Sequence, residues 1–180
     1  LEDINFQEHS FKLDDLLNGY TDAMGCYISN EPYILAKKNI DFNIHNPSDY
    51  GFDFYGGLLF TSKNELNNNP LRVKGIYNAT LKGWEYAFNN IEETSKLIFE
   101  KFNTQNKSLD SLIYEGYALK ELAQFDKGLL GKIDLKKIEE IKRLYLLLGL
   151  NKNITNFKLN DLIYDINKVP LTKEEENYLK

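Results

Sequence analysis

The chain has 180 residues, of which 42% are hydrophobic and 27% charged, and its 22 basic and 27 acidic side chains give a net charge of −5. This length fits a domain of about 100–200 residues, and no apolar run approaches the roughly 18 residues that a membrane-spanning helix needs. The acidic balance, without a cluster of Lys and Arg, argues against binding to nucleic acid. With one cysteine and two histidines, the sequence has neither an internal disulfide nor a Cys/His zinc site, and we expect no metal and no cofactor.

The first third of the chain is predicted to mix short helices with short strands. Leucines at helical spacing predict a helix over residues 12–18 that ends at Gly19, and Asn30 followed by Pro32 predicts a helix over residues 30–39. Compact or alternating apolar runs predict strands at residues 21–28, 41–45 and 56–62.

After residue 63 the pattern becomes helical. Asn69 and Pro70 begin a helix whose apolar side chains recur at spacings of three, four and seven residues. Trp84 lies on this apolar stripe and is predicted to be in the core, and Gly83 beside it predicts a close backbone contact. Further helices are expected at residues 91–102, 109–125 and 135–148, with N-caps at Ser108 and Asp134. A capping box at residues 172–175 starts a last helix.

The sequence contains none of the common catalytic patterns: no glycine-rich dinucleotide fingerprint, no P-loop, no H-E-x-x-H and no G-x-S-x-G. Cys26 is the one obvious nucleophile, and a lone cysteine is more often a small buried side chain. We therefore expect no catalytic residues and no enzyme activity. An enzyme is a weaker hypothesis than a ligand-binding domain or an interaction module.

Two early stretches combine tyrosines with carboxylates and amides. The first contains Tyr27, Asn30, Glu31 and Tyr33, and the second contains Asp49, Tyr50, Asp53, Phe54 and Tyr55. Such groups suit a cleft that stacks a flat polar ring and hydrogen-bonds its edge. On the residues alone, a pair of surface loops with buried tyrosines is the simpler explanation.

Three ordered segments, at residues 19–35, 47–62 and 69–90, resemble the carboxyl-terminal half of the NMT1/THI5-like family. This family is a branch of the periplasmic substrate-binding proteins that is tied to thiamine-pyrimidine uptake and biosynthesis. The positions that match its pattern are Asp22, Ala23, Asn30, Glu31, Pro32, Tyr50, Gly51, Lys82, Gly83, Trp84, Tyr86 and Ala87. The cysteine-rich motif of the fungal synthases has no counterpart here.

The resemblance implies an α/β fold, namely the carboxyl-terminal part of a two-lobed periplasmic-binding-protein-like fold, with short strands early and a mostly helical second half. Residues 1–165 would form a partial ligand-binding domain whose first lobe is largely missing, and residues 166–180 a connector helix towards a following domain. Exposed apolar surface is then expected where the first lobe would pack.

The resemblance also implies a small-molecule site made by Asn30, Glu31, Tyr33, Tyr50, Asp53 and Tyr55. Glu31 would accept a hydrogen bond from an exocyclic amino group or ring N–H of a pyrimidine-like ligand or related amine. Asn30 and Asp53 would bind the ring edge, and the three tyrosines would supply stacking or hydroxyl contacts.

The tail at residues 171–180 resembles the segment that leads out of extracytoplasmic domains in bacterial sensor proteins. This implies a periplasmic sensor domain that signals by lobe closure to a kinase or cyclase output, with membrane contact only through other parts of the parent chain. Two alternatives stay open: a ligand-free interaction module, for example a homodimer, and the substrate-binding protein of an ABC transporter.

Overall fold

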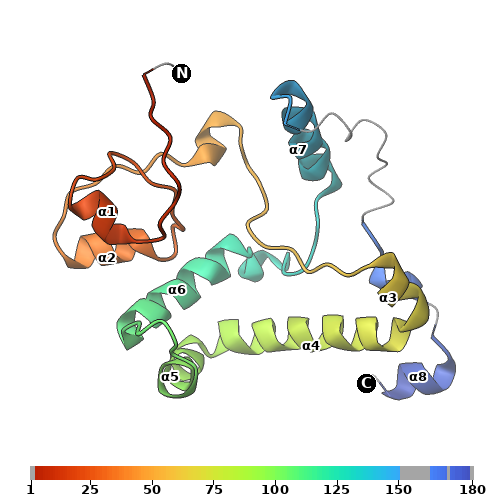
Figure 1. Cartoon of the computed structure of the whole chain (residues 1–180). Helices are drawn as coiled ribbons and strands as arrows, with labels where there is room; N and C mark the ends of the chain where they lie inside the picture. Colours follow the sequence, from red (N-terminus) through yellow and green to blue (C-terminus); the bar gives the residue numbers. More distant parts are fainter. Residues whose placement is uncertain (1–2, 151–162, 170, 179–180) are drawn as a thin grey trace. The chain divides into compact units, whose positions relative to one another are not determined.

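The computed structural model describes residues 3–150, 163–169 and 171–178, and within them the chain is helical (Figure 1). The helices are α1 (Leu13–Leu17), α2 (Glu31–Lys37), α3 (Lys63–Asn68), α4 (Pro70–Asn89), α5 (Ile91–Lys101), α6 (Leu109–Leu122), α7 (Leu135–Leu147) and α8 (Lys173–Tyr178), with 3-10 turns η1 (Pro47–Tyr50), η2 (Phe125–Lys127) and η5 (Ile166–Lys168). None of the described residues forms a strand. The predicted α/β fold with early short strands is therefore wrong.

The three predicted strands, at residues 21–28, 41–45 and 56–62, have no regular hydrogen-bonded structure. A strand needs a neighbouring strand to satisfy its backbone N–H and C=O groups, and an apolar run alone does not supply one. Between the second and third of these runs lies η1, where the Asn46 side chain accepts a 3.2 Å hydrogen bond from the N–H of Ser48. Gly51 ends η1 with a φ of 84°, a left-handed conformation that favours glycine.

The predicted helices of the second part of the chain are confirmed as α4, α5, α6 and α7. Their predicted caps are confirmed too: Ser108 Oγ accepts from the N–H of Ser111 at 3.2 Å, and Asp134 Oδ1 accepts from the N–H of Lys136 at 2.9 Å. At α8 the predicted capping box is confirmed: the N–H of Thr172 donates to Glu175 Oε2 at 2.8 Å, and the N–H of Glu175 donates to Thr172 Oγ1 at 3.3 Å. The short helix α3 was not predicted.

The chain divides into two compact units. Unit 1 comprises Leu1–Phe42 and Asn90–Asp126, and unit 2 comprises Asn43–Asn89 and Lys127–Lys180. Each unit is thus made from two stretches of sequence that lie far apart along the chain.

In unit 1, α5 packs against α6 and α2 also contacts α6. The α5–α6 contact is close because position 116 is glycine: a Cβ atom there would lie 2.7 Å from Ile91 Cγ2. Ile91, Ser95 and Leu112 are buried in this unit, together with Leu35 of α2. Their burial removes apolar surface from water, which is the main favourable term in folding.

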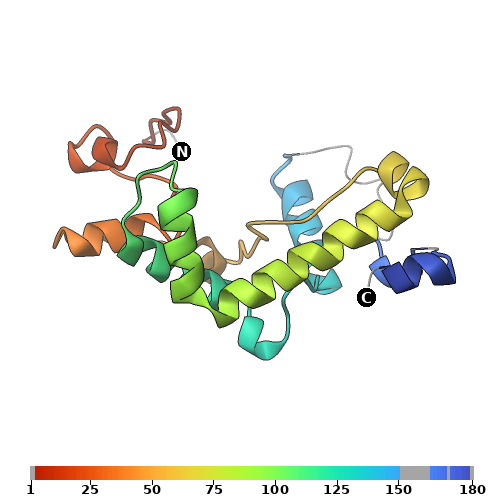
Figure 2. The same ribbon diagram turned by 90° about the horizontal axis from the view of Figure 1, so that it is seen from below.

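In unit 2, the 20-residue helix α4 (Figure 2) packs against α3 at its beginning. Arg72 Nε lies 2.6 Å from Glu65 Oε1 across this corner, and the hydrogen bond from Arg72 lowers the pKa of Glu65.

Further along α4, a Cβ atom at Gly131 would lie 2.6 Å from Leu81 Cδ2, and Gly131 has a φ of 71°. Glycine is therefore required at position 131 for both space and backbone conformation.

Two predictions about α4 are wrong. Trp84 is 43% exposed, and its ring packs on Phe88 of the next turn at a centroid distance of 5.2 Å instead of entering a core. A Cβ atom at Gly83 would have no atom within 4 Å, so this glycine makes no close backbone contact.

Candidate ligand-binding site

The six residues predicted to bind a ligand divide between the two units. Asn30, Glu31 and Tyr33 lie at the start of α2 in unit 1, whereas Tyr50, Asp53 and Tyr55 lie in and after η1 in unit 2. Each half of the candidate site is therefore described within its own unit.

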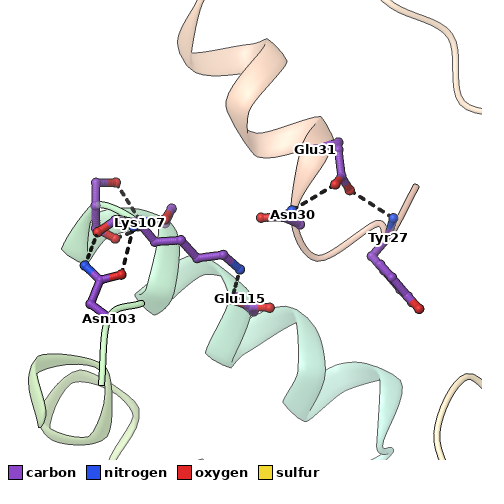
Figure 3. A network of polar contacts seen from close by, with 8 residues as sticks. Tyr27, Asn30, Glu31, Asn103, Lys107 and Glu115 are labelled. Carbon is purple, nitrogen blue, oxygen red and sulfur yellow. Dashed lines mark hydrogen bonds and ion pairs between the residues drawn. The ribbon is translucent and has the colours of Figure 1, made fainter. Parts of the chain in front are cut away.

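In unit 1, the carboxylate of Glu31 closes the turn that leads into α2 (Figure 3). Its Oε2 accepts a hydrogen bond from the N–H of Tyr27 at 3.0 Å, and its Oε1 accepts one from Asn30 Nδ2 at 2.9 Å. The predicted pair Asn30 and Glu31 is thus in direct contact. Because each carboxylate oxygen has two lone pairs, Glu31 keeps acceptor capacity beyond these two bonds.

Glu31 also acts on the neighbouring Cys26, which is exposed and is not the buried side chain that the sequence favoured. Desolvation by the surrounding chain raises the pKa of the Cys26 thiol, and the negative charge of Glu31 raises it further. A raised pKa keeps the thiol protonated and makes it a poor nucleophile at neutral pH.

Tyr33 belongs to a small aromatic and charged cluster between α2 and α6. Its ring stacks on Tyr114 with centroids 4.8 Å apart, and the ammonium of Lys37 lies 5.7 Å from its centroid. Tyr114 donates from its hydroxyl to the carbonyl oxygen of Ile28 at 3.3 Å. Interactions with Tyr33 and then with Asp110 raise the pKa of Lys37. Tyr33 is therefore held by packing on α6, with one of its faces occupied by Tyr114.

A second polar network in unit 1 holds the connection from α5 to α6 (Figure 3). The side chain of Asn103 donates to the carbonyl oxygen of Lys107 and accepts from its N–H, both at 2.8 Å. The ammonium of Lys107 lies 2.7 Å from Glu115 Oε2. These bonds tie the loop to α6 and thereby support the helix against which α2 packs.

In unit 2, α7 contacts two of the predicted residues. The ammonium of Lys137 lies 2.6 Å from Asp53 Oδ1 and 4.5 Å from the centroid of the Tyr55 ring. The hydroxyl oxygen of Tyr55 accepts a 2.8 Å hydrogen bond from the N–H of Asp134. Tyr50 is 67% exposed at the end of η1. Asp53 and Tyr55 therefore share one partner, whereas Tyr50 points to solvent.

Beside this contact lies a cavity of about 230 Å³. Its walls combine carboxylates, ammonium groups and apolar side chains, and they are formed by Gly51, Asp53, Asp134, Lys136, Lys137, Glu140, Ile141 and Leu144. Charged side chains outnumber apolar ones in this cavity, so it is smaller and more polar than the usual pocket for a small molecule.

The sequence did not indicate Lys137, Glu140 or Tyr114 as members of a site. Asp134 was predicted only as the N-cap of a helix. Lys137 is one of several lysines on an amphipathic helix, and 84 residues separate it from Asp53. No pattern in the sequence shows which of these lysines faces the loop after η1.

The residues that the structure describes contain no cluster of three or more His, Cys, Asp or Glu side chains able to hold a metal ion. Among the same residues, no helix combines the length and the apolar character that crossing a membrane requires.

Comparison with known proteins identifies a family. The protein family described as NMT1/THI5 like matches residues 1–94, a span that contains all six predicted ligand-binding residues but not α7. No curated protein and no solved structure matches the chain significantly.

Proposed function

The chain belongs to the NMT1/THI5-like family of substrate-binding domains, and from this premise we propose that it is an extracytoplasmic sensor domain for a small molecule. The family match over residues 1–94 is the observation that carries the proposal. The proposed ligand is a thiamine-precursor pyrimidine or a related amine. The residues proposed to bind it are Asn30, Glu31 and Tyr33 in unit 1 and Tyr50, Asp53 and Tyr55 in unit 2, and each group is considered within its own unit. The proposed location is the periplasm of a bacterium.

The hydrogen bonds by which Glu31 holds the turn into α2 also support its proposed role as an acceptor for the ligand. Tyr27 and Asn30 already hold the carboxylate in one orientation, so a ligand N–H would meet a preorganised acceptor. Preorganisation lowers the entropy that is lost on binding. A polar ring edge would then be recognised at the start of α2.

Signalling would arise because one arrangement of the protein binds the ligand better than another, so that ligand shifts the equilibrium between them. A hinge closure of two lobes around the ligand is the proposed form of this change. A kinase or cyclase in the parent chain is the proposed output.

Calorimetric titration of the chain with the thiamine-precursor pyrimidine tests the proposal. A Glu31→Gln variant keeps one acceptor oxygen for the turn and removes the charge, and it should weaken binding about 10- to 100-fold because hydrogen bonds to charged groups contribute about 1.5–3 kcal/mol. Glu85→Gln, which removes an exposed carboxylate of α4, is the matched control and should leave affinity unchanged. The pyrimidine proposal fails if the wild-type chain gives no binding heat and no thermal shift.

An interaction module is the second candidate, and exposed apolar side chains of α5 and the residue after it favour it. Leu97, Ile98 and Phe99 are 45%, 37% and 42% exposed, and Phe102 is 65% exposed. Several exposed apolar side chains close together in sequence favour an interface with another protein. A second copy of this chain is the simplest occupant, which would make the protein a homodimer.

A further inference from the structure

We propose that Asp53 and Tyr55 form a binding site for an organic ammonium group and that Lys137 is an internal ammonium that competes for this site. The inference rests on the proposed function in one respect, because it takes Asp53 and Tyr55 as ligand-binding residues. It adds that the ligand is a cation. It also adds that Lys137, which lies outside the span that matches the family, would regulate binding of this ligand.

The geometry around the Lys137 ammonium is that of an amine site. Its Nζ atom lies 2.6 Å from a carboxylate oxygen of Asp53 and 4.5 Å from the ring centroid of Tyr55. A carboxylate combined with the face of an aromatic ring is the arrangement that proteins use to bind ammonium ligands. The site thus already holds an ammonium group, that of the protein itself.

The orientation of the Tyr55 ring is held independently of Lys137. The hydroxyl oxygen of Tyr55 accepts a 2.8 Å hydrogen bond from the backbone N–H of Asp134, at the start of α7. A backbone donor at the first turn of a 13-residue helix is a rigid partner. The ring face would therefore remain available if the lysine side chain moved away.

The charges of the adjacent cavity favour a cation. Three carboxylates line it, from Asp53, Asp134 and Glu140, against the two ammonium groups of Lys136 and Lys137. If the Lys137 ammonium leaves, the net charge of the walls changes from −1 to −2, and a ligand ammonium returns it to −1. Ile141 and Leu144 also line the cavity and offer an apolar surface for the carbon skeleton.

Both the room and the mobility that an exchange needs are present. The cavity of about 230 Å³ equals the volume of about eight water molecules at about 30 Å³ each. The side chains of Lys137 and Asp53 are 25% and 63% exposed, and ion pairs that water reaches contribute little to stability. A flexible lysine can therefore turn into solvent when a better-fitting amine takes its place.

Calorimetry with benzylammonium as the probe tests the inference in the full chain. Lys137→Gln removes the competing charge, and we expect it to raise affinity about tenfold, the combined effect of one ion pair and one cation–π contact. Lys136→Gln is the matched control, because it removes a positive charge from the same cavity wall without freeing Asp53, and its effect should be clearly smaller. Benzyl alcohol, which lacks the charge, should bind both variants and the wild type equally.

Two further measurements make the outcome independent of any one variant. Asp53→Asn in the Lys137→Gln background should abolish the gain in affinity, and in the wild-type chain added benzylammonium should shift the side-chain NMR signal of Lys137. If Lys137→Gln leaves the affinity for benzylammonium unchanged or weakens it, Lys137 is a structural partner of Asp53 and the inference is overturned. A pyrimidine titration of the wild type tests the proposed function separately. The wild-type chain can bind the pyrimidine, or fail to bind it, whether or not Lys137→Gln raises the affinity for benzylammonium.

Discussion

Single residues show how local structure and candidate chemistry overlap in this chain. Glu31 was predicted as a ligand acceptor, and in the structure its two oxygens accept hydrogen bonds from Tyr27 and Asn30. Asp53 was predicted as an edge partner, and it pairs with Lys137. A carboxylate has several lone pairs, so it can bind a group of the protein and can also accept a hydrogen bond from a ligand. The sequence shows where these carboxylates are but not which groups of the protein already occupy them.

Cys26 gives a pH-dependent test of the environment around Glu31. Desolvation and then the charge of Glu31 raise the pKa of this thiol, so its alkylation by iodoacetamide should have a midpoint at higher pH in the folded than in the urea-unfolded chain. Since the folded pKa is the higher one, the free energy of unfolding should fall as pH rises through the pKa of the unfolded thiol. Alkylation rates against pH, with and without urea, measure both values.

A Glu31→Gln variant serves as the control for this measurement. In the folded chain it should move the pH midpoint of Cys26 alkylation only part of the way down to the unfolded value. Desolvation, the larger cause of the raised pKa, remains in the variant. Equal midpoints in the folded and unfolded wild-type chain would show that neither desolvation nor the charge of Glu31 acts on this exposed thiol.

At the scale of elements, the helices were predictable because their determinants are local. Pro70 at the start of α4 and the caps Ser108 and Asp134 act within one turn of the helix that they begin. The predicted cap Asn69 instead donates from its side chain to Glu65 of α3. The predicted strands were wrong because a strand depends on a partner elsewhere in the chain, which an apolar run does not specify. The role of a residue within a helix was also not predictable, as Gly83 and Trp84 show.

Two helical glycines should respond in opposite directions to the same substitution. Gly116→Ala places a methyl group 2.7 Å from Ile91 Cγ2 between α5 and α6, and overpacking of this kind lowers the free energy of unfolding by about 1–3 kcal/mol. Gly83→Ala meets no atom within 4 Å and should raise it by about 0.5–1 kcal/mol, because alanine is the better helix former. Urea unfolding followed by circular dichroism measures both. A stabilising Gly116→Ala would show that α5 and α6 do not pack as closely as described.

At the scale of the whole molecule, the described residues bury few large apolar side chains. Leu35, Phe88, Ile91, Leu112 and Val169 are the buried hydrophobic residues among them, whereas Phe6, Phe11, Phe60 and Leu147 are 80%, 87%, 90% and 71% exposed. The expectation of exposed apolar side chains agrees with these exposures.

Self-association is the expected consequence if α5 and the residue after it form an interface. Sedimentation should then show an average mass that rises with concentration, and Phe102→Ser should reduce this rise because it removes the most exposed apolar side chain of that surface. Phe11→Ser removes a more exposed phenylalanine elsewhere in unit 1 and should leave the mass unchanged. A monomer at every concentration, or an equal effect of the two variants, would argue against an interface at α5.

The sequence by itself determined the family, through ordered motifs in the first half, and the positions of the main helices, through periodicity and caps. Motifs, periodicity and caps depend on residues that lie close together in the sequence. The tertiary structure alone decided the absence of strands in the described residues, the exposure of Trp84, and the pairing of Asp53 and Tyr55 with Lys137. Each of these depends on which distant segments come together, because burial and long-range hydrogen bonds are properties of packing and not of local sequence.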